Sequence, residues 1–488
     1  MHTFVILFFT LAAFAVSWLL LVKKQLSLEK SILVAVLVFG FLNNVITVPG
    51  LVPDEPAHIQ TAYRYANVML GKDFIAEAEE GMELQPRNKP IQLRKADLPI
   101  LGLSYFHGPS QGAYQLVRDG FEWFCSQEDT VMVSNLQARC ADSGFIGYLF
   151  PALGIALGRI LRLGMYPSLY LGRLMNLVFY AFCIYWTIRL APFKKWLFAL
   201  LSLTPMAMQF VCSFSYDTPL LGLSFLTIAW LFKLVYQADS LTWRDWMLTL
   251  VLAFLLIPCK FSICPFIPLL VIPASKCGGQ LKKWGLIAAV LLVGIVGLIP
   301  QYADSITRHL GNVNQLSSNS QNARSVPLYT IGWILRNPKE TVQILLHTIR
   351  QNFSFYWTHM LGGRIAAFVP VINWSLPLLV VLVLASMQDP ADSYVLPVGH
   401  RLLHGSAFLI IFFKSMILMM FMYTPLGNEI IDGVQGRYFL PAIPLLCTFL
   451  GTGNISLTET AKRWLTALVF TCNAAIWIEI LMWIRTYP

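Results

Sequence analysis

Long apolar runs separated by short polar segments dominate this chain. Twelve of these runs reach or approach the roughly 20 residues that an α-helix needs to cross a bilayer. They cover about residues 4–22, 31–49, 168–190, 195–212, 217–236, 246–258, 261–274, 284–301, 365–385, 403–423, 437–451 and 464–484. The sixth and seventh are short, and Pro258 and Pro265 interrupt them at "PCKFSICP", which predicts two broken helices. The pattern therefore predicts an all-α polytopic membrane protein with about 12 transmembrane helices, folded as one integral-membrane domain over residues 1–488.

Two long polar intervals, 50–167 and 302–364, interrupt the apolar pattern. The first opens with a predicted helix that Glu55 can cap and whose first turn suits Pro56. We expect this helix to lie flat on the membrane, because its apolar residues recur at helical spacing: Ile59, Ala62, Tyr63, Ala66, Met69 and Leu70. In the second interval "NPKE" predicts another amphipathic helix, with Asn337 as its cap and Glu340 closing a capping box.

Basic residues in the short loops set the orientation. They occur between the predicted spans as Lys23, Lys24 and Lys30, as Arg189, Lys194 and Lys195, as Lys276, Lys282 and Lys283, and as Lys462 and Arg463. If all of these are cytoplasmic, both termini and both long loops lie outside. The segment "FIGYLFPALGIALGRILRLG" (145–164) is apolar enough to span, but a span there would place several of these basic loops outside. We therefore interpret it as a juxtamembrane helix lying on or dipping into the outer leaflet.

Composition agrees with the membrane interpretation and narrows the partners. The chain is 57% hydrophobic and 12% charged, about half the charge of a soluble domain. Its net charge of +10 comes with basic residues beside the spans, which indicates topology and not nucleic-acid binding. The nine cysteines include no C-x-x-C pair, which argues against a zinc site. Cys125 and Cys140 share the first polar loop, and we expect a disulfide between them if that loop is external.

Three acidic or basic groups near the start of the first loop are candidates for chemistry. Asp54, Glu55 and His58 follow directly after an apolar run, in "LVPDEPAH". Helix capping accounts for one acid but does not require two. The functional alternative is that one of these carboxylates lies at the membrane surface and acts as a general base, which takes the proton from an acceptor hydroxyl.

Other candidates lie at the ends of later spans. Asp217 in "SFSYDTP" is either a solvated cap or a site acid, and its neighbours Ser215 and Tyr216 can hydrogen-bond a sugar. Lys260, in the break between two half-helices, either reaches to lipid headgroups or serves the site, since ionisable groups at such breaks are usually functional. Arg437, in "GVQGRYFLPAIP", suits a lipid phosphate, and the two glycines before it let backbone approach a ligand. The alternative for Arg437 is contact with bulk phospholipid.

Several of these motifs together resemble a bacterial membrane-protein family, domain of unknown function 2142. The resemblance covers about residues 43–450 and is carried by "VPDEPAHIQTAYRYA", "YLGRLMNLVFY", "SFSYDTPLLGLSFL", "CKFSICPFIPLLVIP" and "GVQGRYFLPAIPLL". That family is similar in layout to the GT-C superfamily of integral-membrane glycosyltransferases. The resemblance implies membrane-parallel helices in a large first outer loop and a bacterial inner-membrane location with the site facing the exterior. One departure is the extra predicted span 4–22, which precedes the helix that delivers the acids.

The resemblance also implies an activity and a set of residues. The expected activity is sugar transfer from a polyprenyl phosphate to an envelope glycan such as O-antigen, teichoic acid or capsule, with membrane lipids as the surroundings. Asp54 and Glu55 are the expected catalytic acids. The expected substrate-binding residues are His58, Arg64, Arg173, Tyr216, Asp217, Lys260, Gln435, Arg437 and Tyr438. We expect no cofactor and no obligatory metal, although two acids near a phosphate are also a setting that recruits Mg²⁺. The alternatives are a lipid-linked sugar flippase and a polysaccharide polymerase.

Overall fold

Helices dominate the structure, a computed structural model that describes residues 2–24, 26–73, 90–103, 110–125, 129–134, 144–260, 262–311, 327–365, 369–370, 380, 396–451 and 457–486. Residues 2–160 form α1 (His2–Trp18) with a π-helical end (Leu19–Lys23), α2 (Leu28–Ile46), α3 (Glu55–Met69), β1 (Pro90–Arg94), a 3-10 helix (Lys95–Gly102), α4 (Gln111–Asp119), β2 (Thr130–Ser134) and α5 (Phe145–Ile160). Residues 165–271 form α6 (Met165–Leu190), α7 (Lys195–Ser202), α8 (Pro205–Val211), α9 (Asp217–Phe232) with a π-helical end (Lys233–Gln237), α10 (Trp243–Leu256) and a 3-10 helix (Cys264–Val271). Residues 280–486 form α11 (Gln280–Gly311), α12 (Ile331–Arg336), α13 (Pro338–Leu361), β3 (Arg364–Ile365), β4 (Val369–Pro370), α15 (Val398–Tyr423), a 3-10 helix (Gly436–Ala442), α16 (Ile443–Leu450) and α17 (Glu459–Thr486).

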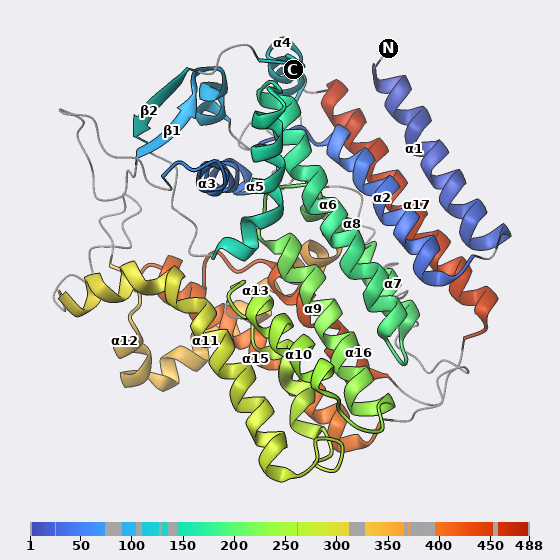
Figure 1. Cartoon of the computed structure of the whole chain (residues 1–488), viewed down its shortest axis with the longest axis vertical. Coiled ribbons are helices and arrows are strands. Elements are labelled where there is room, and N and C mark those ends of the chain that lie inside the picture. The colour runs from blue at the N-terminus through green and yellow to red at the C-terminus, as the bar shows by residue number, and fades with distance from the viewer. Residues whose placement is uncertain are drawn as a thin grey trace.

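Apolar helices form a bundle in which long and short segments alternate (Figure 1). Within the described residues six helices are long and apolar enough to cross a membrane: α2, α6, α9 with its π-helical end, the 280–298 part of α11, α15 and α17. The predicted span 195–212 is divided into α7 and α8, because Pro205 cannot continue the hydrogen-bond ladder of the preceding helix. The predicted span 365–385 lies almost wholly outside the described residues. The membrane class is thus confirmed, whereas the predicted number of about 12 transmembrane helices is not confirmed within the described residues.

The predicted break in the middle of the bundle is present. Helix α10 ends at Leu256, and the chain turns through residues 257–260 before a 3-10 helix begins at Cys264. Lys260 has a φ of 62°, a left-handed conformation that is uncommon for a residue with a Cβ atom. The break therefore delivers the lysine from an irregular turn and not from a helix face.

The apolar face of α3 is covered by protein. Ile59, Ala62, Tyr63 and Ala66 are buried in one cluster that includes residues of β1 and α5. This corrects the expectation that α3 lies with its apolar face on the membrane. The small antiparallel pair β1–β2 is a second difference, since the sequence pattern predicts only helices there.

Helices α5 and α6 pack against each other as a helical hairpin. A Cβ atom on Gly154 would lie 2.4 Å from the Cα atom of Gly172, so the two backbones touch at these glycines. Further along, the rings of Phe150 and Phe179 stack with centroids 3.9 Å apart. Small residues at the crossing permit this close approach. Residues 145–160 are therefore helical as predicted and run alongside α6, while their place in the outer leaflet stays a prediction.

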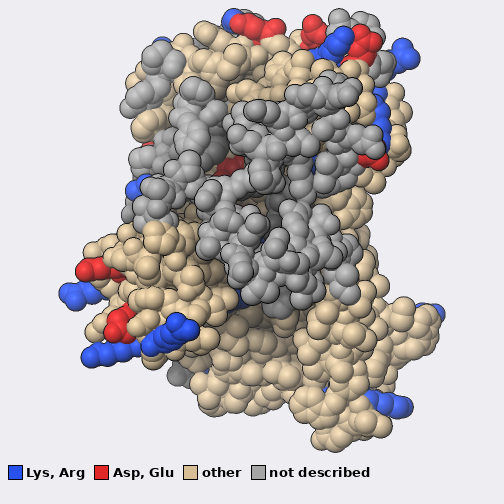
Figure 2. All heavy atoms as spheres, turned by 90° about the vertical axis from the view of Figure 1, so that its left-hand side faces the viewer, with Lys and Arg blue, Asp and Glu red and all other residues tan. Residues whose placement is uncertain are grey.

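Both chain ends lie at the end of the molecule that carries α3, α4 and the β1–β2 pair (Figure 1). The Gln111 side-chain amide, on α4, donates to the carbonyl oxygen of Arg485 near the end of α17 at 3.0 Å. On the face shown in Figure 2, acidic side chains are seen in the upper half and on the edge that protrudes to the left, whereas the lower part shows few charged side chains, basic ones at its right edge. This distribution fits a bundle embedded in lipid beneath a polar cap.

The second polar interval is more helical than the pattern predicts. Helix α11 continues to Gly311, while residues 312–326 lie outside the described residues. Helix α13 begins at Pro338 as predicted, but Asn337 makes no capping hydrogen bond and its side chain instead donates to the carbonyl oxygen of Trp333 at 2.9 Å. The predicted capping box is therefore not formed.

Of the two loop cysteines, the structure describes one. Cys125 is buried, and its backbone N–H donates to the carbonyl oxygen of Arg162 at 2.7 Å. Cys140 lies outside the described residues, so the disulfide between the two stays a prediction.

Candidate active site

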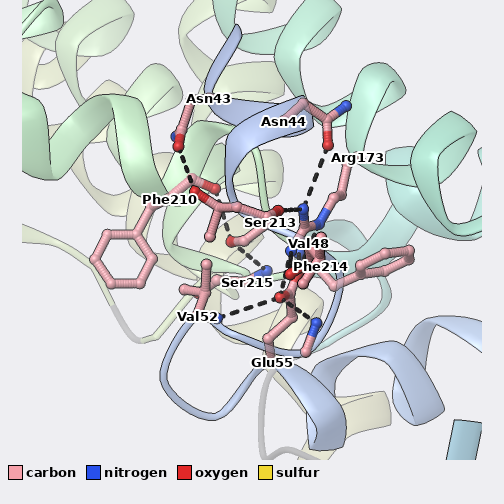
Figure 3. Close-up of polar contacts among 12 residues, drawn as sticks. Asn43, Asn44, Val48, Val52, Glu55, Arg173, Phe210, Ser213, Phe214 and Ser215 are labelled. Carbon is pink, nitrogen blue, oxygen red and sulfur yellow. Dashed lines mark hydrogen bonds and ion pairs between the residues drawn. The ribbon is translucent and has the colours of Figure 1, made fainter. Parts of the chain in front are cut away.

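Glu55 and Arg173 form a fully buried ion pair beneath the turn that precedes α3 (Figure 3). Arg173 Nη2 lies 2.6 Å from Glu55 Oε2, Nε lies 2.8 Å from Oε1, and both side chains are 0% exposed. The same carboxylate accepts backbone N–H bonds from Gly50 at 2.9 Å and from Phe214 at 3.3 Å. A carboxylate with this many donors has no lone pair directed at a substrate.

The guanidinium of Arg173 is equally occupied. It donates to the backbone carbonyl oxygens of Thr47 and Val48 and, at 3.4 Å, to the side-chain oxygen of Asn44 (Figure 3). The pair therefore joins the end of α2, the start of α3, the first half of α6 and the loop before α9. This placement favours a structural role for Glu55 and Arg173 over the catalytic and substrate-binding roles that the sequence suggested.

We expect Glu55→Gln to destabilise the fold, because it leaves the Arg173 charge buried without its counter-ion. Removing one partner of a buried pair typically costs about 3–5 kcal/mol. The matched control is Glu340→Gln, since Glu340 is exposed in the first turn of α13. Thermal unfolding in detergent should show a clearly lower midpoint for Glu55→Gln only. Equal midpoints in the two variants would contradict the structural role.

Asp54, the other acid of the motif, faces the opposite way. It is the residue before the first turn of α3, with a φ of 63°, and its side chain makes no capping hydrogen bond. The carboxylate is 53% exposed, and Oδ2 lies 3.2 Å from Arg437 Nη2. Of the two adjacent acids, only Asp54 is thus available to a ligand.

The "SFSYDTP" segment is a scaffolded loop that ends in a second site acid. Ser215 is buried, and its Oγ accepts the backbone N–H of Asp217 at 3.1 Å. Ser213 Oγ accepts the backbone N–H of Ser215 at 3.1 Å, and Asn176 donates to the Ser213 carbonyl oxygen at 2.8 Å. Ser215 therefore holds the loop and is not placed to bind a sugar, whereas Asp217 is 14% exposed and faces two cations.

Arg437 and Lys260 meet the two acids in one charge cluster, drawn from four distant parts of the sequence. Arg437 Nε lies 3.3 Å from Asp217 Oδ2, and its Nη2 contacts Asp54 as above. Lys260 Nζ lies 3.4 Å from Asp217 Oδ1 and 4.0 Å from the centre of the Tyr438 ring. Lys260 also lies 5.0 Å from the centre of the Tyr216 ring, so two aromatic faces hold the ammonium.

The guanidinium of Arg437 is buried but incompletely bonded. Its side chain is only 6% exposed, yet Nη1 has no hydrogen-bond partner among the residues that the structure describes, and Nε faces Asp217 as an ion pair without hydrogen-bond geometry. Buried N–H groups are normally paired, and an unpaired one needs an explanation. A bound anion would supply the missing acceptors.

The glycines before Arg437 serve a different purpose from the predicted one. A Cβ atom on Gly436 would lie 2.0 Å from the carbonyl oxygen of Tyr356, so this glycine lets the segment touch the backbone of α13. Gly433 has a φ of 80°, which favours glycine. Both fix the path of the chain, so neither is explained by close approach to a ligand. Gln435, beside them, has a buried side-chain oxygen without a partner among the described residues.

His58 lies one turn after Asp54, on α3, and contacts two tyrosine side chains beside the charge cluster. Its Nδ1 lies 2.8 Å from the Tyr148 hydroxyl, and its ring meets the Tyr216 ring edge-on at 5.1 Å. Burial lowers the pKa of His58 to about 4, despite the opposing influence of the carboxylates of Asp54 and Asp217. At neutral pH the imidazole is therefore uncharged and adds no positive charge to the cluster.

This low pKa gives the stability a specific pH dependence. An unfolded histidine has a pKa of about 6.5, so between pH 6.5 and 4 the unfolded chain binds a proton that the folded chain does not. The contribution of His58 is complete above pH 6.5 and is lost as the pH falls, by about 2 kcal/mol at pH 5. Thermal unfolding of the wild type should decline more between pH 7 and 5 than that of His58→Gln. An equal decline would show that His58 does not titrate in this way.

The structure separates the predicted site residues into two groups. In or beside the charge cluster are Asp54, His58, Tyr216, Asp217, Lys260, Arg437 and Tyr438. Gln435 is two residues before Arg437 in the chain, and Glu55 and Arg173 form their own buried pair. Arg64 lies apart from it. This side chain is fully buried and donates to the carbonyl oxygen of Pro90 at 2.9 Å, which ties α3 to β1.

Two neighbours of the cluster were not predicted. Tyr148 binds His58, and the Phe210 ring lies with its centre 4.8 Å from the Arg437 guanidinium carbon. Both are aromatic residues within apolar runs, so nothing in the sequence distinguishes them from core residues. No group of three or more His, Cys, Asp or Glu side chains that could hold a metal ion is present in the described part of the chain.

Comparisons with known proteins give one match. A family model described as "Predicted membrane protein (DUF2142)" matches residues 33–446. Neither a curated protein nor a solved structure matches the chain. The match includes all the charged residues of the cluster.

Proposed function

The chain belongs to the DUF2142 family of predicted membrane proteins, and from that premise and the geometry of the charge cluster we propose that it is a glycosyltransferase of the GT-C type. Its donor is a sugar on a polyprenyl monophosphate, and its acceptor is an envelope glycan. The site faces the exterior of the bacterial inner membrane. No metal is required by the proposal, because the two cations of the cluster can hold a phosphate.

One observation carries this proposal: a nine-tenths buried guanidinium with unpaired N–H groups beside a half-exposed carboxylate. Arg437 and Asp54 lie at the ends of apolar segments, next to the polar cap of α3 and β1. An anionic lipid headgroup brings acceptors for those N–H groups to this depth. The exposed carboxylate is placed where a water-borne acceptor can reach it.

The chemistry follows from these positions. The Asp54 carboxylate takes the proton from an acceptor hydroxyl, and the acceptor oxygen forms a bond to the anomeric carbon. The bond from that carbon to the phosphate oxygen breaks, and its electron pair stays on the phosphate. Arg437 and Lys260 stabilise the negative charge that grows there, which is the interaction that accelerates transfer.

A transfer assay tests the proposal directly. The purified protein in liposomes would be given a panel of polyprenyl monophosphate sugars, each with one radiolabelled sugar, and envelope glycan from the same cell. We expect label to move from the lipid to the glycan for one member of the panel. Transfer from a nucleotide diphosphate sugar instead, or from none of the lipids, would contradict the proposal.

The orientation has its own test. Single cysteines introduced at Lys194 and Lys282 should be labelled only from the cytoplasm, whereas one at Asp54 should be labelled from outside. The eight cysteines that the structure describes are all buried, so a low-background parent needs replacement of Cys140 alone, which lies outside the described residues. External labelling at residue 194 would place the charge cluster on the wrong side of the membrane for an external glycan.

A further inference from the structure

The Asp54–Arg437 contact couples the donor phosphate to the catalytic acid. In the structure without substrate, the proposed base is bound to the cation that is proposed to hold the donor. We propose that the donor phosphate displaces Asp54 from Arg437, so that the carboxylate is released to act as base only when the donor has bound. This inference rests on the proposed function, and it adds an order of events to the site.

The charge balance of the cluster supports an exchange. Asp54 and Asp217 carry two negative charges, Arg437 and Lys260 carry two positive charges, and His58 is neutral. A phosphate that entered without any change would leave a net negative charge among largely buried groups, which is unfavourable. Release of one carboxylate into water restores the balance.

Asp54 is the acid that can leave. It is 53% exposed, and among the described residues its carboxylate forms an ion pair with Arg437 alone, at 3.2 Å. Asp217 is 14% exposed and is held by both Arg437 and Lys260. The less buried carboxylate with fewer partners is the easier one to displace, because water replaces more of what it loses.

The geometry of the guanidinium places the competition at one atom. A phosphate bound through two oxygens uses either the Nη1–Nη2 edge or the Nε–Nη2 edge of arginine. Both edges include Nη2, the nitrogen that Asp54 contacts, so the phosphate and the carboxylate would lie as two adjacent anions on that nitrogen. The unpaired Nη1 then provides the second donor that the phosphate needs.

Displacement also frees the Asp54 carboxylate for the acceptor. The oxygen that contacts Arg437 becomes open to the acceptor hydroxyl, and the proton that it takes comes from that hydroxyl.

Binding of farnesyl phosphate, a short polyprenyl phosphate, tests the exchange without any turnover. Asp54→Asn should bind it about 5- to 50-fold more tightly than the wild type, because the competitor for Nη2 is gone. Asparagine and glycine both tolerate the left-handed backbone at this position, so Asp54→Gly is a second variant with the same expected gain. Unchanged or weaker binding in both variants would overturn the exchange.

Asp432→Asn is the matched control. It removes one negative charge from the segment that delivers Arg437, but Asp432 is exposed and contacts Asn428, not the cluster. Its affinity for farnesyl phosphate should stay within about twofold of the wild type, a change of less than about 0.5 kcal/mol. If Asp432→Asn and Asp54→Asn gained the same affinity for farnesyl phosphate, the gain would come from the lower negative charge alone. That result would overturn the exchange.

Two further binding measurements distinguish a failure of this inference from a failure of the proposed function. Arg437→Gln should weaken the binding of farnesyl phosphate, and inorganic phosphate should bind the wild type far more weakly than the lipid does. If Arg437→Gln binds normally, or if inorganic phosphate binds as well as the lipid, the lipid-donor site itself is wrong. If both results are as expected but Asp54→Asn shows no gain, the donor site stands and only the exchange fails.

Discussion

Replacing Asp54 by asparagine is expected to lower sugar transfer by about 10²- to 10⁴-fold, the usual effect of removing a general base. The asparagine has the same size and suits the left-handed backbone, but it cannot take the proton of the acceptor hydroxyl. Because Asp54 is half exposed and makes no capping bond, the thermal unfolding midpoint should stay close to that of the wild type. The rate of transfer under donor saturation is the quantity to measure.

The adjacent acid gives the contrast for this experiment. Glu55→Gln should fail through instability, whereas Asp54→Asn should fail through chemistry in a folded protein. A near-normal turnover rate in Asp54→Asn would leave this residue as a charged surface group. The base would then have to be sought elsewhere, with Asp217, the other carboxylate of the charge cluster, as the next candidate.

Arg437→Lys is expected to lower the turnover rate as well as the affinity for the donor. Lysine keeps the charge but loses the planar fork, and removing one such transition-state donor typically lowers the rate about 10²- to 10³-fold. Negative charge grows on the phosphate as the sugar leaves, so the lost contact matters most in the transition state. Arg437→Ala should be nearly inactive. Separate measurement of kcat and KM for the donor distinguishes these effects.

Arg401→Lys is the matched control for that series. Arg401 lies on α15, and its guanidinium donates to the carbonyl oxygen of Phe449 at 2.8 Å, at the far end of α16 from the cluster. This exchange should leave the rate unchanged. If Arg437→Lys also transfers sugar at the normal rate, Arg437 does not bind the leaving phosphate.

The sequence by itself determined the class of the molecule and several of its local features. Long apolar runs leave no alternative to helices in lipid, because every backbone N–H and C=O group must be paired within the segment. The same local chemistry predicted the start of α3 near Pro56 and the break around Lys260, since proline acts on its immediate neighbours. Charged residues at the ends of apolar runs, or in the break between two of them, also identified Asp54, Asp217, Lys260 and Arg437 as candidates.

Tertiary structure alone decided what each of those residues does. Asp54 and Glu55 are adjacent and chemically equivalent in the sequence, yet one faces solvent and the other is 0% exposed against Arg173. Burial depends on partners more than 100 positions away in the chain, and no local pattern specifies them. The same holds for Gly436, whose missing side chain matters because of Tyr356, and for Arg64, which binds Pro90 instead of a substrate. Residue type fixes what a group can do, but only the folded chain fixes which groups meet and whether a ligand can reach them.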